Sequence, residues 1–217
     1  MVRHARAKRL RLRVDPHGVR LTVPLRSSKQ QIQQFLNKAE SWLVETWQQQ
    51  QSQTPDLLFL PETLQLFDQK SVLQIQQNQQ QRLFVWQPEQ GLLLLNQKQP
   101  ERCLKAAVLA YAKQVLPQYL QRISQEIGLS YQLCNIRQPK TRWGSCSARH
   151  DIMLHAGAVL MPEPLVRYLC IHELAHTRHF NHSALYWAEV ARHDPHYAQH
   201  RKLLKNYKLP GWWYSLS

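Results

Sequence analysis

Alternating polar and apolar positions near the start of the chain predict a β-hairpin followed by a helix. Residues 8–14 and 19–23 alternate, and the residues between them, which include Pro16 and Gly18, favour a turn. After Ser27 and Ser28, either of which is a suitable N-cap, apolar residues recur at spacings of three and four as far as Trp47. This spacing predicts an amphipathic helix that ends before Pro55.

The next segment changes to short apolar runs separated by turn residues, and then helical spacing returns. The runs predict strands at 57–60, 64–67, 72–75, 83–86 and 92–95. From Cys103 to Ile127 the apolar positions again follow helical spacing. Pro117 predicts that this helix is kinked or divided in two, and Gly128 is a suitable stop.

The last third of the chain combines two strands with further helices. Residues 133–137 and 152–159 have the pattern of strands on either side of a polar loop. Pro162 and Pro164 suit the first turn of a helix that carries residues 165–176, and another helix is expected from about Ser183. The sequence therefore predicts an α+β protein, with a β-rich region containing one helix at 1–100 and a second domain at 101–217.

Composition excludes several classes of protein. The longest purely aliphatic run is residues 92–95, far short of the roughly 20 apolar residues that a membrane span needs. The basic N-terminus is not followed by an apolar segment, so we expect no signal peptide. Four cysteines lack paired spacing, which favours reduced thiols and a cytoplasmic location.

The chain is strongly basic, with a formal net charge of +14. The excess of Lys and Arg lies in residues 1–29 and 100–217, whereas residues 30–99 are slightly acidic. Such a surface attracts polyanions such as nucleic acid, although general solubility is the favoured explanation, because net charge alone does not identify a partner.

The stretch from His172 to His176 carries the strongest chemical signal. Two histidines four residues apart lie on one face of a helix and can reach the same metal ion. Neutral imidazole suits zinc, and Glu173 is placed to take a proton from a water molecule at the ion. The pattern predicts a zinc site in which Glu173 is the general base.

A third protein ligand is needed, and three residues are candidates. His179 shares the helical face, but three ligands along one helix would span about 10 Å and would converge poorly. His182 follows Asn181, which favours the end of a helix, so the chain can turn and present its imidazole from the side; we favour His182. Glu189 on a later helix remains the alternative.

The spacing from His176 to His182 also matches the metzincin proteases, but two features disagree. Metzincins have a glycine where this chain has His179, and they have a methionine turn downstream. The only methionines here are Met1, Met153 and Met161.

The chain resembles the YgjP-type zinc metallopeptidase family, which is related to the SprT and WLM metalloproteases. The resemblance rests on the block from Lys140 to Ser147, which contains Trp-Gly-Ser-Cys, and on the later histidine motif with Asn181-His182-Ser183 and Trp187. It implies a zincin-like core with a small β-rich N-terminal part, zinc bound by His172, His176 and His182, and Glu173 as general base. The family usually has Asn where this chain has His155.

Other residues are weaker candidates. The block from Arg142 to Ser147 is either a structural turn beneath the helix or a substrate contact. Arg142, His155 and Tyr186 are candidate donors to the oxyanion. We expect Cys146 to be buried and His193, His196 and His200 to be exposed or capping residues, and we expect the Trp212-Trp213-Tyr214 tail to pack in the core or to contact a partner.

These observations favour a zinc metallopeptidase that acts on a peptide or protein. The strand at 152–159 is expected to lie at the edge of the cleft and to pair with an extended peptide. Hydrolysis of a nucleotide pyrophosphate bond is an alternative, although the chain has no glycine-rich phosphate cradle. A protease acting on proteins bound to nucleic acid is a further alternative, although no separate binding module is recognisable.

Overall fold

The chain forms two compact units. The computed structural model describes residues 2–5, 7–15, 18–52, 60–69 and 71–214. The units are Met1–Leu58 and Phe59–Ser217. The domain boundary that the sequence suggests near residue 100 falls inside the second unit, and it stays a prediction about which segments fold independently.

The first unit contains the predicted hairpin and helix. Its sheet has the order β1-β3-β2, formed by Val2–His4, Gly18–Pro24 and Arg11–Asp15. Helix α1 (Lys29–Ser52) begins after Ser28, whose hydroxyl accepts a hydrogen bond from the Gln31 N–H at 3.2 Å. The Gln31 side chain accepts in return from the Ser28 N–H at 2.9 Å, which completes a capping box. The tip of the predicted turn, at residues 16 and 17, lies outside the described residues.

A four-stranded sheet opens the second unit. It has the order β4-β5-β7-β6, formed by Thr63–Leu64, Leu73–Asn78, Leu92–Asn96 and Phe84–Gln87. Strands β5 and β7 are parallel, and a short 3-10 helix, η1 (Pro88–Gln90), joins β6 to β7. Leu93 and Leu95 alternate into the core and are fully buried. Of the strand predicted at 57–60, only Leu60 is described, and it is not in a strand.

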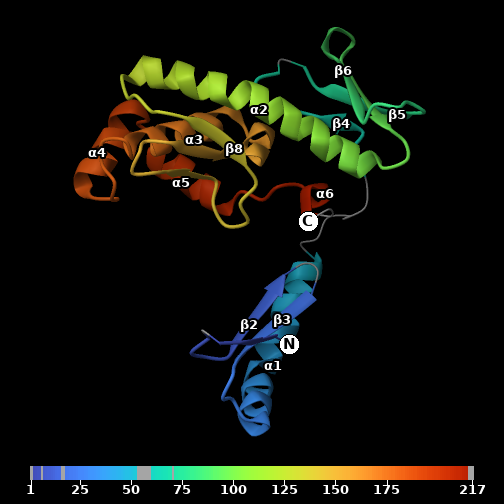
Figure 1. The fold of residues 1–217 in the computed structure, drawn as a ribbon, viewed down its shortest axis with the longest axis vertical. Coiled ribbons are helices and arrows are strands. Elements are labelled where there is room, and N and C mark those ends of the chain that lie inside the picture. Colours follow the sequence, from blue (N-terminus) through green and yellow to red (C-terminus); the bar gives the residue numbers. More distant parts are fainter. Residues whose placement is uncertain (1, 6, 16–17, 53–59, 70, 215–217) are drawn as a thin grey trace. The chain divides into compact units, whose positions relative to one another are not determined.

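The long helix α2 (Pro100–Ile127) packs against both sheets of this unit (Figure 1). It runs as one helix through Pro117, so the predicted division in two is wrong. A proline removes one backbone donor, whereas Leu116 and Leu120 on either side are fully buried in a single core that holds the two halves together. Gly128 ends the helix in the left-handed conformation, with φ of 70°, as predicted.

The second sheet of this unit positions the candidate site. It has the order β8-β10-β9, formed by Cys134–Arg137, Ile152–His155 and Gly144–Cys146. The strand predicted at 152–159 ends at His155, because the next residues form a 3-10 helix, η2 (Ala156–Leu160). The His155 ring caps that helix by accepting a hydrogen bond from the Gly157 N–H at 2.9 Å. Strand β9 lies in the segment that the sequence pattern predicts as a polar loop.

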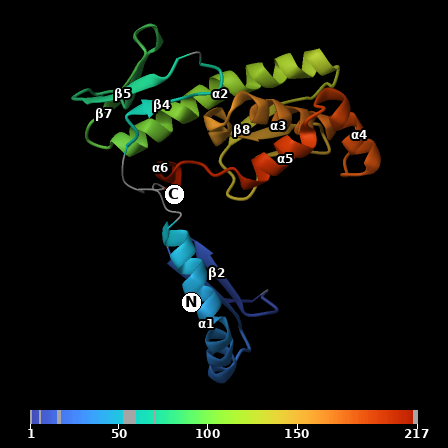
Figure 2. The ribbon, with the colours of Figure 1, turned by 180° about the vertical axis from the view of Figure 1, so that it is seen from behind.

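Four helices complete the unit: α3 (Glu163–Ala175), α4 (Ala184–His193), α5 (Tyr197–Asn206) and the short α6 (Gly211–Tyr214). Helix α3 packs against α2, α4, α5 and strand β9, so most of its surface is covered (Figure 2). The hydroxyl of Ser183 accepts from the Tyr186 N–H at 3.4 Å and caps α4. Trp212 and Trp213 of α6 are buried, as the core-packing interpretation of the tail expects.

The predicted α+β class is confirmed. Within the described residues, seven of the ten strands and a single α-helix precede residue 100, which agrees with a β-rich N-terminal part. None of the helices that the structure describes is long and apolar enough to cross a membrane.

Candidate metal centre

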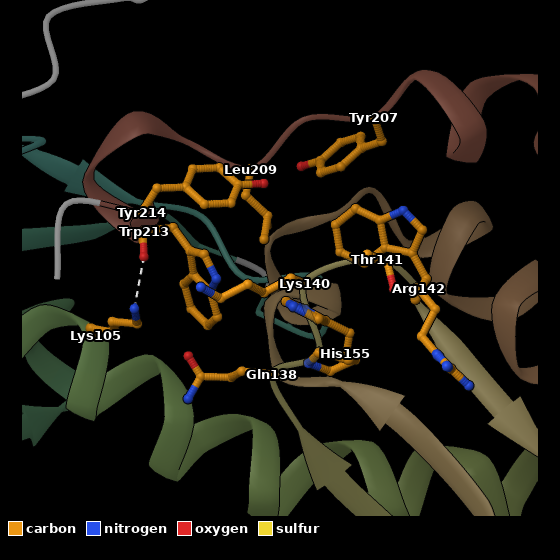
Figure 3. A pocket seen from close by; sticks show the side chains of 12 residues that line it. Lys105, Gln138, Lys140, Thr141, Arg142, His155, Tyr207, Leu209, Trp213 and Tyr214 are labelled. Atoms are coloured by element: carbon orange, nitrogen blue, oxygen red, sulfur yellow. Dashed lines mark hydrogen bonds between the residues drawn. The ribbon is translucent and has the colours of Figure 1, made fainter. Parts of the chain in front are cut away.

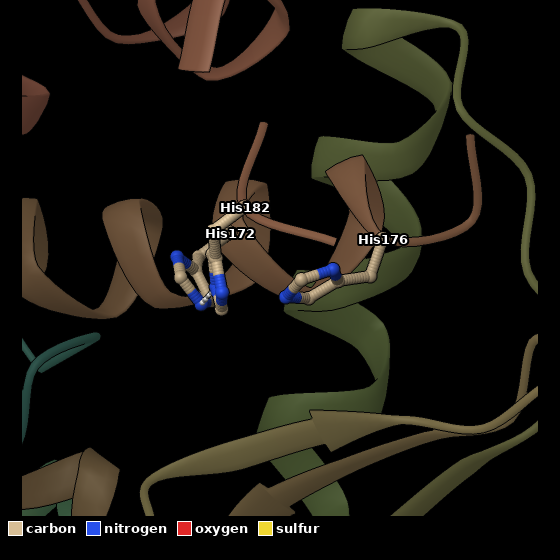
Figure 4. A group of neighbouring side chains, drawn as sticks. All are labelled: His172, His176 and His182. Atoms are coloured by element: carbon tan, nitrogen blue, oxygen red, sulfur yellow. Dashed lines mark hydrogen bonds between the residues drawn. The ribbon is translucent and has the colours of Figure 1, made fainter. Parts of the chain in front are cut away.

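Three histidines from two neighbouring segments converge in the second unit. His172 lies in the last turn of α3, His176 lies at its C-terminal end, and His182 comes from the loop before α4. One ring nitrogen of each lies within 4.8 Å of one of each of the others. Figure 4 shows the three rings turned toward a common space.

The spacing of these nitrogens suits a tetrahedral metal ion. The Nε2 atoms of His172 and His182 are 3.4 Å apart. Two nitrogens on tetrahedral zinc, each at about 2.0–2.1 Å from the ion, are separated by about 3.3 Å. Three neutral imidazoles are also a donor set that zinc prefers and one that leaves a fourth position for water or substrate. The residues therefore fit a zinc ion.

Neighbouring groups fix the orientation of the rings. The Nδ1 of His176 lies 3.0 Å from the carbonyl oxygen of His179 and donates to it when that nitrogen is protonated, which leaves Nε2 as the ligand atom. The Nδ1 of His172 is 3.4 Å from the Tyr168 hydroxyl. The buried Tyr186 ring stacks on His176 with centroids 4.6 Å apart, and its hydroxyl donates to the backbone carbonyl of His172 at 3.0 Å.

The environment of His172 and His176 favours their neutral forms. Burial, reinforced by the positive charges that His176 and His182 can carry, lowers the pKa of His172 to about 3. Burial also lowers the pKa of His176, and the His179 carbonyl partly opposes that change. Only the neutral imidazole has a lone pair for a metal, so the site is prepared for a cation near pH 7.

Glu173 is buried beside strand β9. Its side chain is 4% exposed, and burial raises its pKa to about 8, although the charge of Arg142 acts in the opposite direction. The carboxyl group lies against Gly144: a Cβ atom at Gly144 would come within 2.2 Å of the Glu173 Oε1. The absence of a side chain at Gly144 is what makes room for this carboxyl group.

Strands β8 and β9 are the edge strands of this sheet, and β10 lies between them. Strand β10 pairs with β8 on one side and β9 on the other, so the expectation that residues 152–159 lie at the edge is wrong. The Trp143 carbonyl accepts from His155 and the Ser147 N–H donates to Asp151, so both face β10. Because backbone groups alternate along a strand, those of Gly144 and Cys146 face the outer edge.

The three candidate oxyanion donors occupy different places. Arg142 is exposed and close enough to Glu173 to influence its pKa. Tyr186 is fully buried with its hydroxyl on the His172 carbonyl, and burial raises its pKa so that it stays a donor. His155 is buried, with burial lowering its pKa to about 4, and it lines a separate pocket.

That pocket has a volume of about 290 Å³ (Figure 3). Residues of the C-terminal segment, including Tyr207, Leu209 and Trp213, form one wall. Arg142 and Trp143, which directly precede β9, contribute to it together with His155 and Lys105. The segment that leads into β9 therefore borders this pocket.

Several candidates lie away from the three histidines. Glu189 pairs with Arg178 at 3.0 Å and with His193 at 2.9 Å, and it is not part of the cluster. His179 contributes its backbone carbonyl to His176, and its ring is also not part of the cluster.

Two further expectations concern a histidine and a cysteine. His200 lies 2.7 Å from Asp194, so it is held by an ion-pair partner when protonated. The Cys146 side chain is only half-buried, so the expectation of a buried cysteine is wrong, and burial together with the charge of Glu173 raises its pKa to about 11.

Sequence patterns do not reveal three of the groups that shape the site. The pattern around Gly144 suggests a turn residue, but its role is to leave space for Glu173. Tyr168 lies four residues before His172, one helical turn away, and this spacing is the one signal that could have identified it. The Tyr186 hydroxyl reaches α3 from α4, and no local pattern predicts such a contact.

Comparison with known protein families agrees with a metal-dependent peptidase. Residues 8–207 match the family described as YgjP-like, metallopeptidase domain. Among curated proteins, none matches the chain significantly. Among solved structures, the chain is similar to the metallopeptidase zymogen abylysin of Pyrococcus abyssi, with 24% identity and a TM-score of 0.38 over 44% of this chain and 99% of that chain. It is also similar to the metallopeptidase zymogen jannalysin of Methanocaldococcus jannaschii, with 18% identity and a TM-score of 0.37 over 42% and 94%.

Proposed function

Because the chain belongs to the YgjP-like metallopeptidase family, we propose that it is a zinc-dependent peptidase. In this proposal His172, His176 and His182 hold the zinc ion and Glu173 is the general base. The observation that carries the proposal is the convergence of three imidazoles within 4.8 Å of one another, with the buried Glu173 directly after His172 in the same helix. A bound zinc ion supplies a Lewis acid for the substrate carbonyl and a positive charge that lowers the pKa of nearby water and carboxyl groups.

Glu173 moves the proton in this mechanism. Its carboxylate takes a proton from the attacking water and delivers it to the nitrogen of the leaving amine. The backbone of Gly144 lies against the carboxyl group and limits the positions that it can adopt. Arg142 favours the ionised form of Glu173, which is the form that a general base requires.

The substrate is a peptide or protein that lies along β9. The outward backbone groups of Gly144 and Cys146 are available to pair with an extended chain in the manner of an added strand. Such pairing holds the peptide without regard to its side chains. It brings a substrate carbonyl next to Glu173, which lies directly against Gly144.

Two tyrosines have a positioning role in this proposal. Tyr186 joins α4 to α3 through the His172 carbonyl and supports the His176 ring from one side. Tyr168 contacts the outer nitrogen of His172. Arg142, exposed beside Glu173, is then the strongest of the three predicted oxyanion candidates.

A substrate panel tests the proposal. Purified protein is incubated with casein and a mixed peptide library on one side and with nucleoside triphosphates on the other, each with and without a chelator. We expect chelator-sensitive peptide cleavage by the wild type and a loss of at least about 100-fold in Glu173→Gln, because a general base contributes 10²–10⁴-fold. Nucleotide hydrolysis without peptide cleavage would contradict the proposal.

The other predicted partners and location remain predictions. Nucleic-acid binding is expected to weaken steeply with salt if the basic surface drives it. The cytoplasmic location rests on the cysteine pattern alone.

A further inference from the structure

The pocket of about 290 Å³ borders the segment that packs against the proposed general base. Trp143 lines the pocket, and the next residue, Gly144, is the one against which the Glu173 carboxyl group packs. A peptide that follows the edge of β9 past Glu173 therefore continues to the mouth of this pocket. The chemistry of the pocket then determines which substrate side chains or ends are accepted.

The lining of the pocket is positive. Lys105, Lys140 and Arg142 all contribute to it, and no aspartate or glutamate is among the described residues that line it. Lys140 and Arg142 are exposed on the loop before β9. None of the salt bridges seen in the described part of the chain involves any of the three. An anion entering the pocket meets three cations and no competing carboxylate.

Lys105 brings a partly buried positive charge to the pocket. Its ammonium group donates to the Trp213 carbonyl at 2.8 Å and lies 5.5 Å from the centre of the Trp213 ring (Figure 3). The side chain is partly buried, and burial lowers its pKa. An ammonium has three donors, and burying its charge is costly unless an anion pairs with it. A ligand carboxylate would remove that cost.

His155 adds a neutral donor. Its Nδ1 accepts from the Gly157 N–H at 2.9 Å, so in the neutral ring the proton is on Nε2. Burial keeps this ring neutral by lowering its pKa to about 4, so it offers a hydrogen bond and no charge. Trp143 packs against the His155 ring with centroids 5.0 Å apart and holds it in place.

Aromatic rings form the remaining walls. Trp143, Tyr207, Trp213 and Tyr214 surround the cations, so the pocket offers apolar surface to an alkyl chain and positive charge to its end. A carboxylate at the end of a short alkyl or peptide segment has this combination of properties.

We propose that this pocket binds a carboxylate of the peptide substrate, supplied by an acidic side chain or by the C-terminus, so that the enzyme selects anionic peptides. The proposal rests on the peptidase function proposed above. It names a substrate class, and it assigns Lys105, Lys140 and His155 to its recognition.

Binding can be measured without cleavage in the full-length Glu173→Gln protein. Trp143 and Trp213 line the pocket, so their fluorescence reports on its occupation. Three acetylated peptides of one alanine-rich sequence are titrated, with zinc and without: an amide with one glutamate, the same amide with glutamine, and the glutamine peptide with a free C-terminal carboxylate. A nucleoside triphosphate is the fourth probe.

Variants distinguish binding in this pocket from general attraction of anions to the basic surface. Lys105→Met removes the ammonium and keeps the length of the side chain, and Lys140→Gln removes a charge from an exposed position where folding is not at risk. Lys105→Arg keeps the charge. Lys113→Met, on the same helix but exposed and outside the pocket, is the matched control.

We expect one of the two carboxylate peptides to bind about tenfold more tightly than the glutamine amide, as for one charge-assisted hydrogen bond. Lys105→Met and Lys140→Gln should weaken this preference, and Lys105→Arg and Lys113→Met should keep it. Preference for the glutamate peptide identifies the side chain as the source, and preference for the free end identifies the C-terminus.

Three results would each overturn the proposal. The first is equal binding of all three peptides, and the second is a carboxylate preference that survives in Lys105→Met and Lys140→Gln. The third is that the triphosphate binds more tightly than the carboxylate peptides and depends on the same lysines. Cleavage of peptides by the wild type separates this result from the proposed function. Cleavage without a carboxylate preference refutes the carboxylate pocket alone, whereas a carboxylate preference without any cleavage refutes the peptidase function alone.

Discussion

At the scale of single residues, the candidate site requires glycine at position 144, because the space beside its Cα is occupied by the Glu173 carboxyl group. Gly144 lies so close to the Glu173 carboxyl group that a methyl group would overlap its Oε1. The backbone of Gly144 is not in the left-handed region that only glycine adopts easily, so alanine is excluded by this contact and not by strain.

We therefore predict that Gly144→Ala lowers kcat/KM for peptide cleavage by about 100-fold or more, because it displaces the proposed general base. Zinc binding should be unchanged, since none of the three histidines moves. Steady-state kinetics and metal analysis check both parts. Ser145→Ala on the same strand is the control and should keep its activity; full activity in Gly144→Ala would show that Glu173 can act from another position.

His155 gives a prediction about stability and pH. Its pKa is about 4 in the folded protein and about 6.5 in the unfolded chain, so below pH 6.5 the unfolded chain binds the proton first. The free energy of unfolding is therefore highest above pH 6.5 and falls as the pH drops toward 4. Between pH 7 and pH 5 this group alone accounts for a loss of roughly 2 kcal/mol.

The variant His155→Asn isolates this effect. An asparagine oxygen can accept the Gly157 N–H as the ring nitrogen does, and it does not titrate. Denaturant unfolding at pH 7 and pH 5 should show a smaller decrease in stability for His155→Asn than for the wild type. Equal decreases in the two proteins would mean that His155 is not held neutral by burial.

At the scale of elements, the site depends on how α4 is attached to α3. Tyr186 is fully buried, and its hydroxyl reaches the His172 carbonyl. If this contact is structural, Tyr186→Phe should lower the free energy of unfolding by about 1 kcal/mol and change kcat/KM only a few-fold. Turnover that is slower by about 100-fold or more, with unchanged stability, would instead identify Tyr186 as an oxyanion donor.

Local sequence patterns predicted most of these elements. They failed where contacts between elements determine whether a strand or helix forms and where it ends. The hairpin, α1, the Gly128 stop and the start of α4 all follow from spacing and caps that the sequence displays. The division at Pro117 was wrong because the burial of Leu116 and Leu120 outweighs one lost hydrogen bond.

Strand β9 was missed for a related reason. It has only three residues, and pairing with β10 forms it, not an alternating pattern of its own. The end of β10 at His155 is likewise not visible in the local pattern, because there the Gly157 N–H donates a hydrogen bond to the His155 ring and caps the 3-10 helix that follows.

At the scale of the whole molecule, the organisation of the core predicts how truncated chains behave. Leu93 and Leu95 of β7 and Leu104 of α2 belong to one buried cluster, together with residues of α3. We expect a chain of residues 59–217 to fold cooperatively and to bind zinc. A chain of residues 101–217 lacks Leu93 and Leu95, so it should expose apolar residues of α2, such as Leu104, and it should aggregate or unfold.

Circular dichroism and thermal unfolding of the two truncated chains check this expectation. A cooperative transition in residues 101–217 would support the boundary near residue 100 that the sequence pattern suggests. Failure of residues 59–217 to fold would mean that residues 1–58 contribute to the stability of the second unit.

The histidine motif predicted more about the site than any other feature of the sequence. The i, i+4 spacing of His172 and His176, and the turn that follows Asn181, are local features, and the structure brings both histidines together with His182. The wall behind Glu173 and the cationic pocket depend on residues that are distant in the sequence, such as Lys105 and Trp213, so no pattern could place them.

The most direct test of the metal site is the zinc content of purified protein, measured by atomic emission in the wild type, Glu173→Gln, His182→Ala and His179→Ala. We predict one zinc per chain in the wild type, in Glu173→Gln and in His179→Ala, and none after dialysis in His182→Ala. The His179 ring is outside the cluster, and its backbone carbonyl is retained in the alanine variant. Zinc that stays bound in His182→Ala, or that is lost in Glu173→Gln, would contradict the assignment of His172, His176 and His182 as the ligands.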